Sequence, residues 1–137
     1  VADDELHAVQ AAPYVGAELG PVGGAGDEHG VFAAQVLDDK KGFDIVVLDV
    51  GSQSMFADYL IIAAGGSERQ INALASEVED RSEKNGRFVK HIEGKNGSGW
   101  ILMDYGDVVI NLMVESMREK YNLEKIWSDC EQIEWEV

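Results

Sequence analysis

The strongest constraint on the fold comes from residues 100–113, where two apolar runs flank a short turn. Residues 100–105 and 108–113 are rich in β-branched, aromatic and long apolar side chains, and Gly106-Asp107 joins them. This pattern is typical of a β-hairpin. Because both faces of the first run carry apolar side chains, the sheet that contains it needs a cover on each side.

Three further strands are predicted before the hairpin, and the last of them, which is the nearest to the hairpin, is short. Residues 43–50 form a β-branched run that suits a strand buried on both faces, and residues 59–64 form a second such run. Residues 88–92 resemble a short strand. The chain therefore has enough strand-forming segments for a small sheet.

Helices are predicted between and around these strands. Residues 31–37 suit a short helix that Gly42 would end. Ser67 and Gln70 form a capping box that opens the clearest helix, and Gly86 is a good stop for it. Residues 115–121 look helical, and residues 123–127 form a last apolar turn.

The order of elements is therefore α-β-β-α-β-β-β-α, which predicts a small mixed α/β (α+β) domain. We expect a mixed β-sheet with helices mainly on one face. If the helices cover only that face, a partner chain can supply the cover of the other.

Composition divides the chain into three parts. Residues 1–30 are rich in Ala, Gly and acids and contain Pro13 and Pro21, so we expect a flexible N-terminal arm. Residues 31–128 form the expected domain. Residues 129–137 form an acidic tail that we expect to fray or dock loosely.

The chain is strongly acidic, with a formal net charge of −15. Residues 1–39 carry eight acids and no Lys or Arg, and residues 40–137 carry the other 18 acids and all 11 bases. This charge disfavours nonspecific binding to nucleic acid or to anionic membranes and favours a basic protein partner. We therefore expect no direct binding to nucleic acid and no membrane association.

The single cysteine, Cys130, allows no intrachain disulfide and has no nearby His in the sequence to activate it. No apolar run approaches the length of a membrane span. The first residues resemble neither a secretory signal nor a mitochondrial transit peptide. We expect a cytoplasmic protein.

Catalytic and metal-binding patterns are weak. Gly51-Ser52 followed by Asp58 resembles the Gly-Ser turn and metal-binding Asp-x-Asp of nucleotidyltransferases, but Leu60 stands where the second carboxylate is needed. His91 has no second His or Cys at metal spacing, and no Ser-His-Asp or Cys-His arrangement is visible. We expect no catalytic residues, no metal and no cofactor, and a nucleotide-binding or nucleotidyl-transferring enzyme is the alternative.

Several strings occur in order along residues 32–128. They are DIVVLD at 44–49, DYLII at 58–62, SERQ at 67–70, EG at 93–94, WILMDYGDVVI at 100–110 and REKYNLEKIW at 118–127. Together they resemble the Iojap family, the ribosomal silencing factors. The arm and the residues after Cys130 lie outside the resemblance.

The resemblance implies a noncatalytic translational repressor. Members bind the large ribosomal subunit through universal large-subunit ribosomal protein fourteen and sterically block joining of the small subunit. The resemblance also implies a nucleotidyltransferase-like core without its active site, which agrees with the single carboxylate at Asp58, and a homodimer when free. A homodimer that scaffolds something else is a third hypothesis.

The chain departs from the family pattern at three positions. The family commonly has His where this chain has Asn111, Asp where it has Asn122, and Thr or Asn where it has Gly66. An Asn at 111 weakens any acid-base role but still offers a hydrogen-bond donor and acceptor.

Candidate partner-binding residues follow from the needs of an interface, which places apolar anchors in the centre and charges at the rim. The candidate anchors are Trp100, Leu102, Tyr105 and Met113, and the candidate rim acids are Asp58, Glu93, Asp104 and Asp107. Strand alternation puts Trp100 and Tyr105 on opposite faces, so we expect one of them at the interface and favour Trp100. Tyr121 and Trp127 are expected to pack the C-terminal helix.

Overall fold

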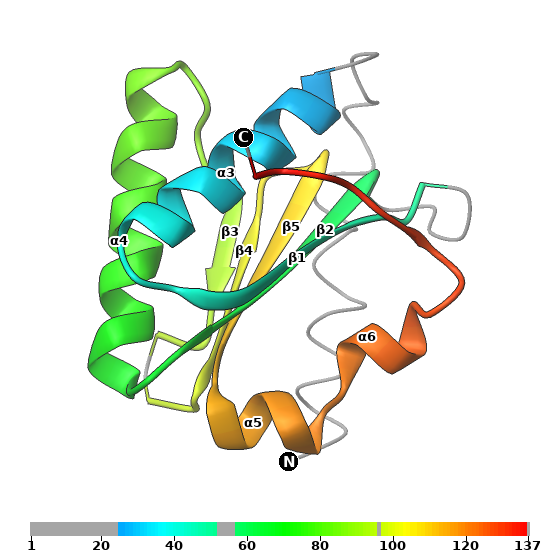
Figure 1. The fold of residues 1–137 in the computed structure, drawn as a ribbon. Helices are drawn as coiled ribbons and strands as arrows, with labels where there is room; N and C mark the ends of the chain where they lie inside the picture. Colours follow the sequence, from blue (N-terminus) through cyan, green and yellow to red (C-terminus); the bar gives the residue numbers. More distant parts are fainter. Residues whose placement is uncertain (1–24, 52–56, 96, 137) are drawn as a thin grey trace.

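The computed structural model describes residues 25–51, 57–95 and 97–136. Within them, helices and strands follow one another as the sequence predicts, with two more elements at the C-terminal end (Figure 1). The elements are α3 (Ala25–Asp39), β1 (Phe43–Asp49), β2 (Tyr59–Gly65), α4 (Glu68–Lys84), β3 (His91–Glu93), β4 (Trp100–Asp104), β5 (Val108–Val114), α5 (Glu115–Lys120), α6 (Leu123–Ile126) and β6 (Glu131–Gln132). No helix of this described part is long and apolar enough to cross a bilayer.

The strands form one six-stranded sheet in the order β3-β4-β5-β2-β1-β6. β2 and β5 are parallel, and the other neighbouring pairs are antiparallel. The mixed α/β class predicted from the sequence is therefore confirmed. The hairpin is confirmed too, with β4 paired to β5 and Gly106 at a φ of 93° in the turn between them.

The two long helices, α3 and α4, pack side by side against one face of the sheet, which we call the helix face (Figure 1). This face buries Leu37 from α3, Ile71 and Leu74 from α4, and Ile101 and Ile110 from the hairpin. Each of these side chains is at most 1 % exposed. This cluster supplies the larger of the two apolar cores.

The opposite side of the sheet, which we call the hairpin face, carries a second cluster. It contains Leu60, Trp100, Leu102 and Met113 from the strands, joined by Leu123 at the start of α6. Trp100 and Leu102 belong to this cluster, while Ile101, Met103 and Tyr105 belong to the helix face, so the predicted alternation along β4 is confirmed. The expected packing role of Tyr121 and Trp127 is confirmed by their place in this cluster.

Helix α4 begins and ends where its sequence predicts. The Ser67 hydroxyl accepts a hydrogen bond from the Gln70 backbone N–H at 3.1 Å, and the Gln70 side-chain oxygen accepts one from the Gly66 N–H at 2.6 Å. At the other end Gly86 has a φ of 79°, and the Arg87 N–H bonds to the Ser82 carbonyl at 2.8 Å. These bonds satisfy the groups that a helix end leaves unpaired.

The first helix is longer than predicted. It begins at Ala25 rather than Val31, within the residues assigned to the arm. His29, which lies in this added part, is 5 % exposed and packs edge-on against the Tyr105 ring, so the start of α3 is held on the sheet. Residues 1–24 of the expected arm lie outside the described residues.

The third strand and the tail also differ from the prediction. The strand expected at 88–92 runs from His91 to Glu93. Glu131–Gln132 forms β6 and pairs with β1, so this part of the tail is not loose. The Trp135 indole N–H donates to the Ile45 carbonyl at 3.2 Å, which fixes the chain beyond β6 against the sheet.

Candidate functional site

The hairpin face is organised around a buried hydrogen bond between two side chains. The Trp100 indole N–H donates to Asn111 Oδ1 at 2.8 Å, and neither residue is more than 4 % exposed. The β4–β5 register pairs Trp100 with Met113 and Leu102 with Asn111, so the two partners lie one diagonal step apart on the same face. The bond fixes the orientation of the large indole ring.

Helix α5 and the turn after it complete the surroundings of Trp100. The rings of Trp100 and Tyr121 lie 5.5 Å apart between centroids, at an angle of 36°. The Asn111 Nδ2 donor and the Tyr121 hydroxyl are both buried without a hydrogen-bond partner among the described residues. The ring contact packs Tyr121 against the indole on the hairpin face.

The turn between β4 and β5 begins at Asp104, which is fully buried. Its Oδ1 accepts a hydrogen bond from the Gly106 N–H at 2.7 Å, while Oδ2 has no partner in the described part. Burial raises the pKa of Asp104 above its usual value, and the Gly106 bond and the neighbouring His91 and Lys90 offset this only in part. Asp104 therefore shapes the turn.

Asp107 closes the turn and connects three distant segments. Its Oδ2 accepts from Arg87 Nη1 at 2.8 Å, and its Oδ1 lies 3.4 Å from His29 Nδ1. Burial alone would raise the pKa of Asp107, but the contacts with His29 and Arg87 outweigh it and hold that pKa below its usual value. The carboxylate is thus stabilised in its charged form.

Asp58 lies next to Asp107 at the start of β2. Its backbone N–H and that of Tyr59 donate to the Asp107 carbonyl at 2.9 and 3.1 Å. Burial, together with the charges of Asp107 and Asp49, raises the pKa of the Asp58 carboxyl. Within residues 25–51, 57–95 and 97–136, no group of three His, Cys, Asp or Glu is arranged to hold a metal ion.

The eight predicted partner-binding residues fall into four places. Trp100, Leu102 and Met113 are buried in the hairpin face, whereas Tyr105 lies on the helix face, where its ring meets that of His29 edge-on at 4.8 Å. Asp58, Asp104 and Asp107 gather at the turn. Glu93 lies on β3, opposite Leu102. Their partner-binding role stays a prediction, and the partly exposed members are Asp58, Glu93 and Asp107.

Sequence reasoning missed the partners of these residues. His29 and Arg87 lie 78 and 20 positions from Asp107, and neither forms a motif with it. Asn111 was noted as a departure from the family pattern but not as the acceptor of the Trp100 indole. Strand register would have placed Asn111 diagonally from Trp100, whereas His29 and Arg87 give no comparable signal.

A second feature is a groove of about 450 Å³ where β1, α5 and α6 meet. Four carboxylates line it, from Asp44, Glu115, Glu119 and Glu124. Arg118 also lines it and donates to Glu124 from Nε at 3.2 Å and from Nη2 at 2.9 Å. Ser52 of the nucleotidyltransferase-like pattern lies outside the described residues, and Gly51 and Asp58 do not line this groove.

Comparisons with known proteins agree on one family. The family model described as "Ribosomal silencing factor during starvation" matches residues 27–137. "Ribosomal silencing factor RsfS" of Bacillus subtilis is 43 % identical over 72 % of this chain and 83 % of its own length. "Protein Iojap, chloroplastic" of Arabidopsis thaliana is 40 % identical over 74 % of this chain and 42 % of its own length.

A solved structure gives the same result for the fold. A crystal structure of a protein from Chromobacterium violaceum superposes with a TM-score of 0.71 at 35 % identity. The match covers 74 % of this chain and 84 % of that one. The fold and the sequence therefore point to the same relatives.

Proposed function

The chain belongs to the ribosomal silencing factor family, whose members are regulators of translation rather than enzymes, and on this premise we propose that it represses translation on the large ribosomal subunit. Bound there, it sterically blocks the small subunit from joining. The observation that carries the proposal is the family match over residues 27–137, which includes every described strand and helix except the first residues of α3.

The proposed docking partner is universal large-subunit ribosomal protein fourteen. Its identity follows from the family resemblance, and charge supports it, because an acidic chain favours a basic protein partner. We expect the protein to act in the cytoplasm. We also expect the free protein to be a homodimer.

We assign the direct contact with the ribosomal protein to acids around the hairpin that are at least partly exposed. Asp58 lies at the turn, and Glu93, whose side chain is 38 % exposed, lies on β3 beside β4. Asp107 is 11 % exposed and already paired with Arg87 and His29, so its part in the rim is the smaller one. Carboxylates in such positions form charge-assisted hydrogen bonds with Lys and Arg of a partner. Trp100, Leu102 and Met113 are buried in the hairpin face, and Leu102 lies opposite Glu93 across β3 and β4.

Cosedimentation with isolated large subunits tests the proposal. The double variant Asp58→Lys, Glu93→Lys should lower the affinity about 10-fold, since two reversed rim charges at about 0.7 kcal/mol each give this factor. The control is Asp38→Lys, Glu134→Lys, which makes the same change of net charge at two exposed positions away from the hairpin. Equal binding by both variants would contradict the assignment of the rim.

The enzyme alternative makes a separate prediction. A nucleotidyltransferase needs two carboxylates to hold Mg²⁺. Asp58 can supply one, but position 60, where the second is needed, is Leu60. We therefore propose a noncatalytic protein that needs no cofactor. Calorimetry with ATP and Mg²⁺ should give no heat of binding at micromolar nucleotide, and a clear binding isotherm would revive the alternative.

A further inference from the structure

The basic side chains of this acidic chain are unevenly distributed. Residues 84–95 contain four of the 11 bases, Lys84, Arg87, Lys90 and Lys95, and only one acid, Glu93. The remaining 25 acids and seven bases lie elsewhere. One short segment is therefore positively charged in a chain whose net charge is −15.

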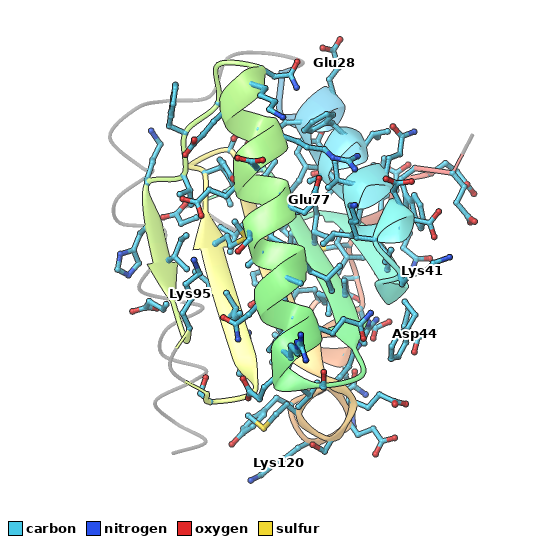
Figure 2. The ribbon with its side chains drawn as sticks, turned by 90° about the vertical axis from the view of Figure 1, so that its left-hand side faces the viewer. Glu28, Lys41, Asp44, Glu77, Lys95 and Lys120 are labelled. Atoms are coloured by element: carbon cyan, nitrogen blue, oxygen red, sulfur yellow. The ribbon has the colours of Figure 1, made fainter. Side chains whose placement is uncertain are left out.

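This segment runs along one edge of the sheet. β3 is the first strand in the order β3-β4-β5-β2-β1-β6, so its outer side has no neighbouring strand among the described residues. Figure 2 shows β3 at the margin beside α4, with Lys95 next to it and Lys41 on the opposite side of the molecule. We call residues 84–95 the basic edge.

An aromatic side chain is exposed in the middle of the basic edge. Phe88 is 65 % exposed, the most exposed large hydrophobic residue of the described part. Lys84 and Lys90, on either side of it in sequence, are both exposed. An exposed aromatic ring flanked by lysines is a typical combination for binding nucleic acid, because the ring stacks on an unpaired base while the lysines meet phosphates.

Nearby acids neutralise only part of this charge. Arg87 is paired with Asp107 at 2.8 Å, and Lys95 Nζ lies 3.9 Å from Glu79 Oε1. Lys84 and Lys90 have no carboxylate within 4.0 Å in the described ranges. These two ammonium groups are available to a partner.

We propose that the basic edge binds the phosphate backbone of ribosomal RNA beside the protein docking site. The inference rests on the proposed function, since β3 adjoins β4 and Glu93 belongs to both the basic edge and the proposed rim. Lys84 and Lys90 contact phosphates, and Phe88 stacks on an accessible base. This replaces the expectation, drawn from the charge of the whole chain, that the protein makes no direct contact with nucleic acid.

An acidic protein segment is the competing occupant, and the observations favour RNA. The carboxylates of such a segment would account for the lysines but not for the exposed ring of Phe88, whereas the RNA backbone and bases account for both. A ribosomal subunit also exposes RNA over much of its surface, so a factor docked on one of its proteins lies close to phosphates.

The salt dependence of large-subunit binding tests the proposal. Loss of two phosphate contacts in the variant Lys84→Gln, Lys90→Gln should lower affinity about 20-fold at 0.1 M salt and reduce the salt slope by about 1.4, at about 0.7 per contact. The control Lys40→Gln, Lys41→Gln makes the same charge change at the end of α3 and should retain the wild-type slope. Identical slopes for the two variants would overturn the proposal.

A photo-crosslinker in place of Phe88 identifies the occupant directly. Replacement of Phe88 by p-benzoylphenylalanine should give a crosslink to the large subunit that ribonuclease digests. A crosslink sensitive only to protease would assign the edge to a protein partner and overturn the proposal. If the wild-type chain binds no large subunits, the proposed function fails, whereas wild-type binding without these two signatures removes only the RNA contact.

Discussion

The helix face and the hairpin face of the sheet are both buried, but they are built differently. The helix face lies under two long helices and its core is mainly aliphatic. The hairpin face is joined by the short helices α5 and α6 and contains a buried side-chain hydrogen bond between Trp100 and Asn111. The helix face is therefore stabilised mainly by apolar burial, whereas the hairpin face adds a directional polar contact that fixes the position of the indole.

The largest expected effect is on the helix face. Leu74→Ala removes a side chain that is 1 % exposed in the centre of the core between α4 and the sheet. We expect a loss of about 3 kcal/mol in the free energy of unfolding. Urea denaturation measures it, and the fraction that remains folded should bind large subunits with wild-type affinity. A loss below 1 kcal/mol would show that the helix face is not the stabilising one.

The next effect isolates the buried polar pair. Trp100→Phe removes the indole N–H and leaves Asn111 Oδ1 buried without its donor, which costs about 2 kcal/mol. The double variant Trp100→Phe, Asn111→Leu removes both partners and should recover much of that stability. A double-mutant cycle read by denaturation and by cosedimentation separates stability from binding. Additive losses would mean that the two side chains are not coupled.

Two acids of the same turn have pKa values shifted in opposite directions, so their substitution by Asn should differ in its effect on stability. The pKa of Asp107 is lower in the folded state than in the unfolded state. Its carboxylate therefore stabilises the fold at any pH above the unfolded-state pKa, and this stabilisation is lost as pH falls through the lowered pKa. Asp107→Asn should therefore destabilise the fold by about 1.5 kcal/mol at pH 7. The difference from wild type should shrink toward pH 3 in acid-titrated urea unfolding.

Asp104, in the same turn, serves as the comparison for Asp107. Its pKa is raised, so the charged carboxylate costs stability at neutral pH, and this cost disappears as pH falls through the raised pKa. Asp104→Asn keeps an oxygen for the Gly106 N–H and should leave stability at pH 7 unchanged or higher. Destabilisation by this variant as large as that of Asp107→Asn would refute the contrast within the turn.

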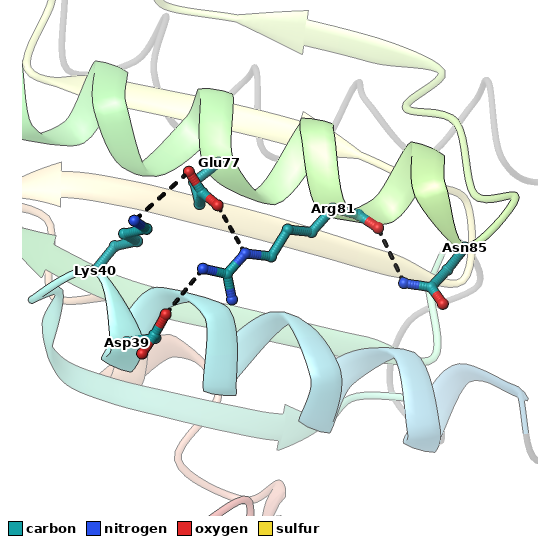
Figure 3. A network of polar contacts seen from close by, with 5 residues as sticks. All are labelled: Asp39, Lys40, Glu77, Arg81 and Asn85. Carbon is teal, nitrogen blue, oxygen red and sulfur yellow. Dashed lines mark hydrogen bonds and ion pairs between the residues drawn. The ribbon is translucent and has the colours of Figure 1, made fainter.

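The smallest expected effect concerns the surface of the helix face. Arg81 joins the two long helices by donating to Asp39 at 2.8 Å and to Glu77 at 2.7 Å (Figure 3). Arg81→Gln should lower the melting temperature less than Leu74→Ala, Trp100→Phe or Asp107→Asn. Asp39 is exposed and Arg81 and Glu77 are partly exposed, so water and salt screen these ion pairs. The difference should vanish at 1 M salt, and a difference that persists there would point to a packing role.

Local signals were enough to predict much of the fold. The capping box at Ser67, the Gly-Asp turn of the hairpin and the alternation along β4 are each determined by neighbouring residues, and each is confirmed. The long start of α3 and the β6 pairing were missed, because His29 is held by Tyr105 and Asp107 and the tail is held by β1, all distant in the sequence. Such contacts leave no periodicity in the sequence.

The candidate site was less predictable than the fold. The sequence identified Asp107 but not the His29 and Arg87 that hold it, since residues so far apart meet only after the sheet has formed. It divided the charge only at residue 39 and did not predict that residues 84–95, the basic edge, bring four bases to one margin of the sheet. Summed charge predicts solubility and general partners, but the position of each charge determines which surface binds what.

A subunit-joining assay on sucrose gradients measures the proposed block of small-subunit joining directly. Large subunits are incubated with an excess of the protein before small subunits are added, and the protein is followed across the gradient. If the protein blocks joining, the amount of joined ribosomes should decrease while the protein sediments with free large subunits. Undiminished joining with the protein bound to the large subunit, or with the protein left at the top of the gradient, would contradict it.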